Sequence, residues 1–244
     1  KRSEVKARAG WAAAETANAD LRSFAYSVSH DMKAPTNTLQ MLLDEIRLNL
    51  GTSASADTLD LLDMSMQTIT RMQTLIEDVL GYTCLIETKP EFENINLQDC
   101  VDYAISNLTA DIQDANAIIE TDEMPTLPVI KTQMNMLFQN IVSNAIKFRD
   151  PDIRPKIHIS YRADPDSDTH RISFTDNGIG ISEGDKYRIF SLFQRLNARE
   201  KYDGTGIGLP MCQRVAINHS GQVTVKSEPN HGSEFTVTWP RRKL

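Results

Sequence analysis

The chain has 244 residues, of which 40% are hydrophobic and 24% charged, and its formal net charge is −7. This length allows one large domain or two modest ones with hydrophobic cores. The mixed, mildly acidic charge argues against a broad basic surface for nucleic acid. The cysteines are far apart and odd in number, which argues against a disulfide framework or a zinc cluster and favours a reducing, cytoplasmic compartment. We expect all three, Cys84, Cys100 and Cys212, to be buried as small hydrophobic residues.

Residues 1–20 have the composition of a helix interior and do not begin with methionine. We therefore expect this segment to be a signalling helix or linker that continues from an upstream sensor domain. No run in the chain approaches the roughly 20 apolar residues that a membrane-spanning helix needs, so no membrane segment is expected within it. The sequence leaves open whether the upstream part is soluble or membrane-anchored.

Apart from a gap around Pro35, apolar residues then recur at steps of three or four in two segments, as they do along one face of an α-helix. A polar stretch near 51–56 separates the segments, which predicts a hairpin of two long helices over residues 21–87. The core of one hairpin is too narrow to be stable, so we expect a homodimer in which two hairpins form a four-helix bundle; packing onto the rest of the same chain is the alternative. The two seams are Leu21, Phe24, Val28, Met32, Leu39, Leu42, Ile46 and Leu50, and Leu59, Leu62, Met66, Ile69, Met72, Ile76 and Val79.

From about residue 88 onwards, short alternating runs that are typical of half-buried strands replace the long helical patterns. Helical patterns near 97–114, 131–148 and 207–219 lie among them. We therefore expect an α+β domain over residues 88–244, with helices covering one face of a mixed or antiparallel sheet and a boundary near Thr88–Pro90. The strand-like runs are AIIETDE, KIHISYRA, RISFTDN, GQVTVKSE and SEFTVTWP.

Two motifs in this second part carry residues suited to a nucleotide. The helical segment QNIVSNAIKF places Asn140, Asn144 and Lys147 on one face, where amide oxygens and an amine suit a hydrated Mg²⁺ and a phosphate. The segment DNGIGI puts Asp176 at a strand end, followed by glycines that let the backbone approach a flat ligand. An ordinary polar helix face and an ordinary turn are the alternatives.

A third motif, DGTGIGLPMC, has glycines at positions 204, 206 and 208 ahead of an apolar helical pattern. Backbone N–H groups at such a helix N-terminus suit phosphates. The motif lacks the GK[ST] ending of a Walker loop and does not match a dinucleotide fingerprint. Each motif alone is nonspecific, but their order, with the aromatic segment FSLFQRL between the second and the third, is rare.

In this order of motifs the chain resembles the sensor histidine kinases over nearly its whole length. The segment SHDMKAP is similar to the family's phospho-acceptor box, NIVSNAIKF to its N box, DNGIGI and GTGIGL to its two glycine boxes and FSLFQRL to its F box. The second part resembles the Bergerat ATP-binding fold, which is shared with gyrase, Hsp90-type chaperones and mismatch-repair ATPases. The HDMKAP variant and the wording from the F box onwards resemble the phytochrome-like, soluble-sensor branch.

The resemblance implies ATP and Mg²⁺ as cofactors and a role for each matching residue. Asn144 would supply an amide oxygen to Mg²⁺, with Asn140 and Lys147 near the triphosphate. Asp176 would accept the adenine amino group. For Arg195 two interpretations stay open, a phosphate contact and a solvated charge. The adenine pocket would be shaped by Gly178 and Gly180, the ATP lid anchored by Phe190 and Phe193, and the phosphates covered by Gly204, Thr205, Gly206, Gly208 and Leu209.

The adjacent His30 and Asp31 are the expected catalytic pair. If the Asp31 carboxylate accepts the Nδ1–H of the imidazole, Nε2 is left free to attack the γ-phosphate in line. Helical spacing turns His30 away from Val28 and Met32 and towards solvent. Pro35 lacks a backbone donor and is expected to kink the helix beside the reactive site.

These features predict an ATP-dependent protein-histidine kinase, a phosphotransferase with a nitrogenous acceptor, that phosphorylates itself on His30. It would pass the phosphoryl group to an aspartate in the receiver domain of a response regulator. One alternative is a Bergerat-type ATPase or chaperone clamp, which leaves SHDMKAP unexplained. Another is a non-catalytic scaffold, which would not need three intact nucleotide motifs. Ala34 stands where relatives with phosphatase activity carry Thr or Asn, so we expect weak phosphatase activity.

Overall fold

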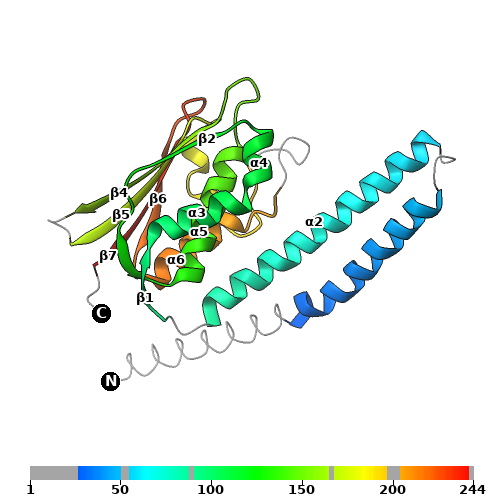
Figure 1. Ribbon diagram of the computed structural model, residues 1–244, viewed down its shortest axis with the longest axis horizontal. Coiled ribbons are helices and arrows are strands. Elements are labelled where there is room, and N and C mark those ends of the chain that lie inside the picture. Colours follow the sequence, from blue (N-terminus) through cyan, green and yellow to red (C-terminus); the bar gives the residue numbers. More distant parts are fainter. Residues whose placement is uncertain (1–26, 51–54, 88–90, 165–167, 197–203, 242–244) are drawn as a thin grey trace, which may run out of the picture. The chain divides into compact units, whose positions relative to one another are not determined.

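The computed structural model describes residues 27–50, 55–87, 91–164, 168–196 and 204–241. The chain divides into two units, Lys1–Glu87 and Thr88–Leu244, which are described one at a time (Figure 1). Several sequence-based expectations lie outside the described residues: the signalling segment 1–20, the seam residues Leu21 and Phe24, and the boundary at 88–90.

The first unit contains two long helices, residues 27–50 and α2 (Ala56–Glu87). Helical structure continues through Pro35, and the Thr36 hydroxyl donates to the carbonyls of Met32 (2.9 Å) and Lys33 (3.0 Å) in the preceding turn. The Oγ of Ser55 accepts the N–H of Thr58 (3.2 Å) and so caps the start of α2. The expected helical hairpin is confirmed.

The buried line of the hairpin follows a seven-residue repeat. In α2, Leu62, Ile69 and Ile76 are buried at that spacing. In the first helix, Ser29 and Thr36 are buried and also lie seven residues apart. A period of seven is the pattern of two helices that cross at a small angle, so the intramolecular core is narrower and more polar than the expected seams.

The two sides of this buried line differ in chemistry. On one side the helices are bridged by polar contacts: Arg47 to Asp63 (2.9 Å), Asn37 to Gln73 (3.1 Å) and Lys33 to Glu77 (3.7 Å). At 100° per residue the expected seam of the first helix falls on the opposite side. There the chain by itself leaves large apolar side chains 37–53% exposed: Val28, Met32, Leu39, Leu42, Ile46, Met72 and Leu75.

The second unit is an α/β sandwich in which one face of a five-stranded sheet is covered by helices (Figure 1). Its strand order is β2-β4-β5-β7-β6, with β2 and β4 parallel and the other neighbours antiparallel. A separate pair, β1 and β3, is antiparallel and was not expected from the sequence. The elements are β1 (Glu93–Asn96), α3 (Leu97–Asn107), α4 (Thr109–Asp114), β2 (Ile118–Thr121), β3 (Thr126–Val129), α5 (Lys131–Lys147), β4 (Lys156–Asp164), β5 (Thr169–Asp176), the 3₁₀ turns η2 (Glu183–Asp185) and η3 (Arg188–Phe190), α6 (Gly208–Asn218), β6 (Gln222–Ser227) and β7 (Ser233–Pro240).

Alternation along the strands creates the core between sheet and helices. Ile159 of β4 lies opposite Phe174 of β5, and both are at most 1% exposed. The ring of Phe174 meets that of Phe138 from α5 edge to face at 5.1 Å between centroids. Because side chains two residues apart share a face, this arrangement also aims Asp176, at the end of β5, towards the helices. The expected mixed sheet covered by helices on one face is confirmed.

Two cysteines meet the expectation of burial and one does not. Cys100 and Cys212 are buried, which raises the pKa of their thiols to about 11 and about 12. Cys84, near the end of α2, is exposed because its position lies away from the buried line of the hairpin. Among the described residues, none of the helices combines the length and apolarity that crossing a membrane requires.

Candidate functional site

The carboxylate of Asp176 lies where β5 gives way to the DNGIGI turn. Its Oδ1 accepts hydrogen bonds from the backbone N–H groups of Gly178 (2.8 Å) and Ser233 (3.2 Å). Burial raises the pKa of Asp176, and the two N–H groups partly oppose that rise because they stabilise the carboxylate. With Oδ1 held by the backbone, Oδ2 is the atom suited to accept a hydrogen bond from a ligand such as an amino group.

The turn that follows Asp176 packs backbone to backbone against the turn between β6 and β7. Gly180 has a φ of +68°, and a Cβ there would overlap the carbonyl of Glu228. Gly232 has a φ of +75°, and a Cβ there would overlap the carbonyl of Asp176. Only glycine adopts these conformations at such close range without strain, so both turns depend on these two positions.

Helix α5 carries the polar set Asn140, Asn144 and Lys147 at steps of four and three residues, and all three are half-buried. The amide Nδ2 of Asn140 donates to the Met136 carbonyl (2.8 Å) in its own helix. A Cβ added at Gly208 would come within 2.6 Å of the Asn140 Oδ1. The polar face of α5 therefore lies directly against the start of α6.

The glycine-rich segment ahead of α6 lies over the end of α5. The Lys147 ammonium lies 4.9 Å from the centroid of the Phe148 ring and directly beside Gly204. The N–H of Phe193 donates to the Gly206 carbonyl (3.1 Å), which joins the F box to the second glycine box. Within the segment, the Ile207 N–H lies 3.4 Å from the Thr205 Oγ1.

The other expected residues of the F box and of α6 differ in burial. Phe190 ends η3 and is half-buried, whereas the ring of Phe193 is 58% exposed with the backbone at a φ of +60°. Arg195 and Leu209 are half-buried. The residues between the F box and Gly204 that belong to the expected lid, 197–203, lie outside the described residues.

The residues present suit ATP. A carboxylate acceptor at a strand end, two side-chain amides, an ammonium and a helix N-terminus are the donors and acceptors that an adenine and a triphosphate require. Within the described part of the chain, no group of three or more His, Cys, Asp or Glu is arranged to hold a metal ion. The amide oxygen of Asn144 is chemically suited to hold a divalent cation together with phosphate oxygens.

The His30–Asp31 pair belongs to the first unit. Both side chains are largely exposed, at 73% and 78%, and the Nδ1 of His30 lies 3.5 Å from the Asp31 Oδ1. His30 lies on the polar side of the hairpin, three residues before Lys33 and seven before Asn37. The imidazole is thus accessible, with a carboxylate at the outer limit of hydrogen-bond distance from Nδ1.

Comparison with known proteins bears on both units. Residues 130–243 match the family of histidine kinase-, DNA gyrase B- and HSP90-like ATPases. Over 226 residues the chain is 36% identical to the phytochrome-like protein Cph1 of Synechocystis sp., an alignment that covers 93% of the chain and 30% of Cph1. In sequence the chain is therefore similar to histidine kinases and to phytochrome-like proteins. It is also 28% identical over 229 residues to the sensor-like histidine kinase SenX3 of Mycolicibacterium smegmatis, covering 90% of the chain and 57% of SenX3.

A solved structure supports the fold of the chain. Full-length ShkA in complex with AMPPNP matches 90% of the chain with a TM-score of 0.70 and 20% sequence identity, and the match covers 46% of ShkA. The expected resemblance to histidine kinases, including the phytochrome-like branch, is confirmed. The chain spans less than a third of the length of its phytochrome-like relatives from Synechocystis and Nostoc.

Sequence reasoning missed the residues that hold Asp176 from the neighbouring strands. Ser233 supplies an N–H to the carboxylate, and Ser227 bonds to both turns beside it. The run SEFTVTWP predicts a strand but not its register, and the register is what places Ser233 opposite Asp176. The glycine and serine at the start of that run were the available signal.

Proposed function

We propose that this protein is an ATP-dependent protein-histidine kinase that phosphorylates itself on His30 and donates the phosphoryl group to an aspartate of a response regulator. The observation that carries the proposal is the pairing, within one chain, of a half-buried carboxylate near the end of α5 with an exposed imidazole–carboxylate pair on the hairpin. The ATPase family of residues 130–243 and the similarity to SenX3 support it.

In the proposed nucleotide site, different residues bind the adenine and the triphosphate. The Oδ2 of Asp176 would accept the adenine 6-amino group, while the start of α6 and the Lys147 ammonium would face the triphosphate. Asn144 and Asn140 would contribute amide oxygens between them. Mg²⁺, held by Asn144 and phosphate oxygens, would supply charge neutralisation at the phosphates.

The transfer itself exchanges one bond to phosphorus for another. The Nε2 lone pair of His30 would attack the γ-phosphorus, forming a P–N bond as the P–O bond to the β-phosphate breaks, and ADP leaves with that electron pair. The proton on Nδ1 stays in place, and the imidazole becomes cationic. The Asp31 carboxylate would stabilise that cation and fix the tautomer. An aspartate of the partner then takes up the phosphoryl group and regenerates His30.

The hairpin is proposed to act as a homodimer. Its exposed apolar side includes Met32, Leu39 and Ile46 at heptad spacing, which matches the seam of a helical bundle. A second copy of the same side would cover these residues, while the polar side that carries His30 stays open. The sensor domain upstream and a cytoplasmic location belong to the same proposal, which fits an ATP-using chain whose described cysteines form no disulfide.

Phosphatase activity is proposed to be weak. Ala34 lies one helical turn after His30 and is exposed, and its methyl group cannot orient a water molecule. The hydroxyl of Thr38, one turn further on, donates to the Ala34 carbonyl at 3.1 Å. The Thr38 hydroxyl is thus bonded to the backbone and is poorly placed to orient a water molecule in place of a polar side chain at position 34.

Incubation with γ-labelled ATP tests the kinase proposal. The protein is expected to acquire a label that is acid-labile and base-stable, and His30→Gln is expected to abolish it. His158→Gln is a matched control, because His158 is also half-exposed and paired with a carboxylate, Asp122, at 3.0 Å. It should keep the label. Label that persists in His30→Gln contradicts the assignment, and steady ATP hydrolysis without label favours the ATPase clamp.

A further inference from the structure

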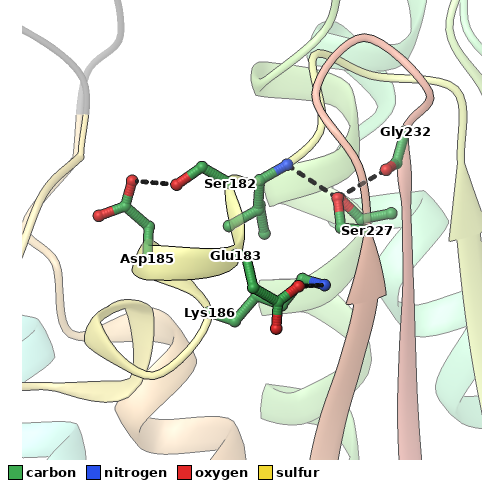
Figure 2. Close-up of polar contacts among 8 residues, drawn as sticks. Ser182, Glu183, Asp185, Lys186, Ser227 and Gly232 are labelled. Carbon is green, nitrogen blue, oxygen red and sulfur yellow. Dashed lines mark hydrogen bonds and ion pairs between the residues drawn. The ribbon is translucent and has the colours of Figure 1, made fainter.

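The turn between β6 and β7 is bonded directly to the turn that follows Asp176. The N–H of Asn230 donates to the Ile179 carbonyl (2.8 Å), and the N–H of Ile181 donates to the Ser227 Oγ (2.8 Å). After Ile181 the chain is stabilised by local contacts, among them a hydrogen bond from the Ser182 hydroxyl to the Asp185 carboxylate (2.7 Å) (Figure 2). Ser227, at the end of β6, therefore joins the segment that begins at Ile181 to the sheet.

The hydroxyl of Ser227 makes three contacts, and counting hydrogens fixes the direction of each. It accepts from the N–H of Ile181, and its single hydrogen goes to the Gly232 carbonyl at 2.7 Å (Figure 2). The third contact, to the Ser233 Oγ at 3.0 Å, must then receive its hydrogen from Ser233. All donor and acceptor capacity of Ser227 is used to join two backbone groups and the side chain of Ser233.

Two of these partner residues touch Asp176. Ser233 is its cross-strand partner in the β5–β7 register and donates its own N–H to the Asp176 Oδ1. Gly232 lies so close to the Asp176 carbonyl that a Cβ would overlap it. Ser227 bonds to the residues on both sides of the Gly232–Ser233 peptide, so the hydroxyl restrains the orientation of that peptide and its N–H, together with the strand pairing.

We propose that Ser227 is a positioning residue for nucleotide recognition, which acts by holding the Ser233 N–H on Asp176 so that Oδ2 faces the adenine amino group. The proposal rests on the proposed ATP site. Loss of the hydroxyl leaves the Ile181 N–H and the Gly232 carbonyl without this partner and frees the turn to move. The carboxylate then rotates away from the orientation that suits an amino group.

The test compares two ligands and several variants of the whole chain. Dissociation constants are measured for ATP and for purine riboside triphosphate, which lacks only the 6-amino group. Wild type should prefer ATP. Ser227→Ala should weaken ATP by about tenfold, the effect of one lost polar partner, and leave the affinity for the analogue within about twofold. Ser227→Thr keeps the hydroxyl and should restore the preference.

Ser173→Ala is the matched control. Ser173 is as buried as Ser233, at 8%, and its hydroxyl lies 3.1 Å from that of Thr236 in the same sheet, but it bonds to neither turn beside Asp176. It should leave the ratio of the two dissociation constants unchanged even if it lowers the thermal midpoint. A ratio in Ser227→Ala equal to that of wild type, or equal weakening of both ligands, overturns the proposal.

Two further outcomes remain decisive. If Ser227→Ala does not fold, Ser227→Cys takes its place with the same expected loss of preference, because a thiol is a weak donor and acceptor. If wild type binds neither triphosphate, the ATP site itself is wrong and this proposal fails with it. If wild type prefers ATP and the Ser227 variants prefer it equally, the role of Ser227 is refuted but the kinase proposal is not.

Discussion

Replacing Asp176 with asparagine should separate nucleotide binding from stability. The substitution keeps the shape of the side chain and an Oδ1 that can accept from Gly178 and Ser233. It removes the charge and turns the second oxygen into a donor, which would oppose the adenine amino group. We therefore expect Asp176→Asn to lose ATP affinity while remaining folded.

The expected magnitudes follow from the two roles of the carboxylate. A hydrogen bond from a ligand to a charged acceptor contributes roughly 1.5–3 kcal/mol, so losing it should weaken ATP by about 10- to 150-fold. In the ligand-free Asp176→Asn protein, the two N–H groups make weaker hydrogen bonds to a neutral amide, which lowers stability. This loss is offset because the variant no longer incurs the desolvation cost of a charged carboxylate. The free energy of unfolding at neutral pH should thus change by less than about 1 kcal/mol.

The pH dependence has a defined sign. Burial raises the pKa of Asp176 in the folded state above its unfolded value of about 3.9, so the ionised carboxylate lowers the stability of wild type at neutral pH. This cost is complete above the raised folded pKa and disappears as the pH falls below the unfolded pKa. Wild type should therefore gain stability relative to Asp176→Asn on acidification, while its ATP affinity falls through the raised pKa.

Urea denaturation from pH 4 to 8 measures the stability, and titration with a fluorescent ATP analogue measures the affinity. Asp185→Asn serves as the control, because Asp185 lies in η2 and contacts Ser182 and Arg188 rather than the pocket. It should bind like wild type. An Asp176→Asn protein that binds ATP within threefold of wild type would refute the adenine role, and one that unfolds outright would refute the stability reasoning.

Four other changes test separate parts of the molecule. Gly180→Ala should reduce ATP affinity and lower the thermal midpoint by several degrees, because a Cβ there meets the Glu228 carbonyl at a φ that costs roughly 1–2 kcal/mol; an unchanged midpoint in a melt would contradict this. Leu42→Glu should shift sedimentation from dimer towards monomer, since it charges the exposed apolar side of the hairpin, and an unchanged sedimentation coefficient would argue against that interface. Ile69→Ala should lower the free energy of unfolding by about 2–5 kcal/mol in urea, as expected for a truncated core side chain, whereas a loss below 1 kcal/mol would show that the hairpin core is not where the buried line indicates. Ala34→Thr should accelerate loss of label from a phosphorylated receiver in the presence of ADP, and no acceleration would show that this position is not what limits the phosphatase.

Local sequence patterns predicted the type of most secondary-structure elements and the location of the nucleotide motifs. Steps of three and four residues predict the hairpin, and alternation predicts the five strands of the main sheet, because burial on one face imposes those periods on the sequence. The strands β1 and β3 were missed because β1, ENIN, has a single apolar residue and β3, TLPV, contains a proline, which argues against a strand. The polar sets on α5 and in the glycine motifs were identifiable because they contrast with the apolar pattern around them.

Periodicity identified the apolar seam of the first helix but not the residues that this helix buries against α2 within one chain. The large apolar residues Met32, Leu39 and Ile46 are exposed in the single chain, whereas Ser29 and Thr36 are buried. A helical pattern identifies an apolar face but not which neighbour covers it, and two long helices can meet along a narrow line that small residues occupy.

The sequence by itself therefore determined the classes of the elements, the order of the nucleotide motifs and the unusual His30–Asp31 pair, because these depend on residue type and spacing. Only the tertiary structure decided how Asp176 is held. Its partner Ser233, together with Gly232 and Ser227 beside it, comes from β6, β7 and the turn between them, about 50 residues further along, and their approach depends on strand register and on backbone contacts. Register is a relation between strands, so no local pattern in either strand specifies it.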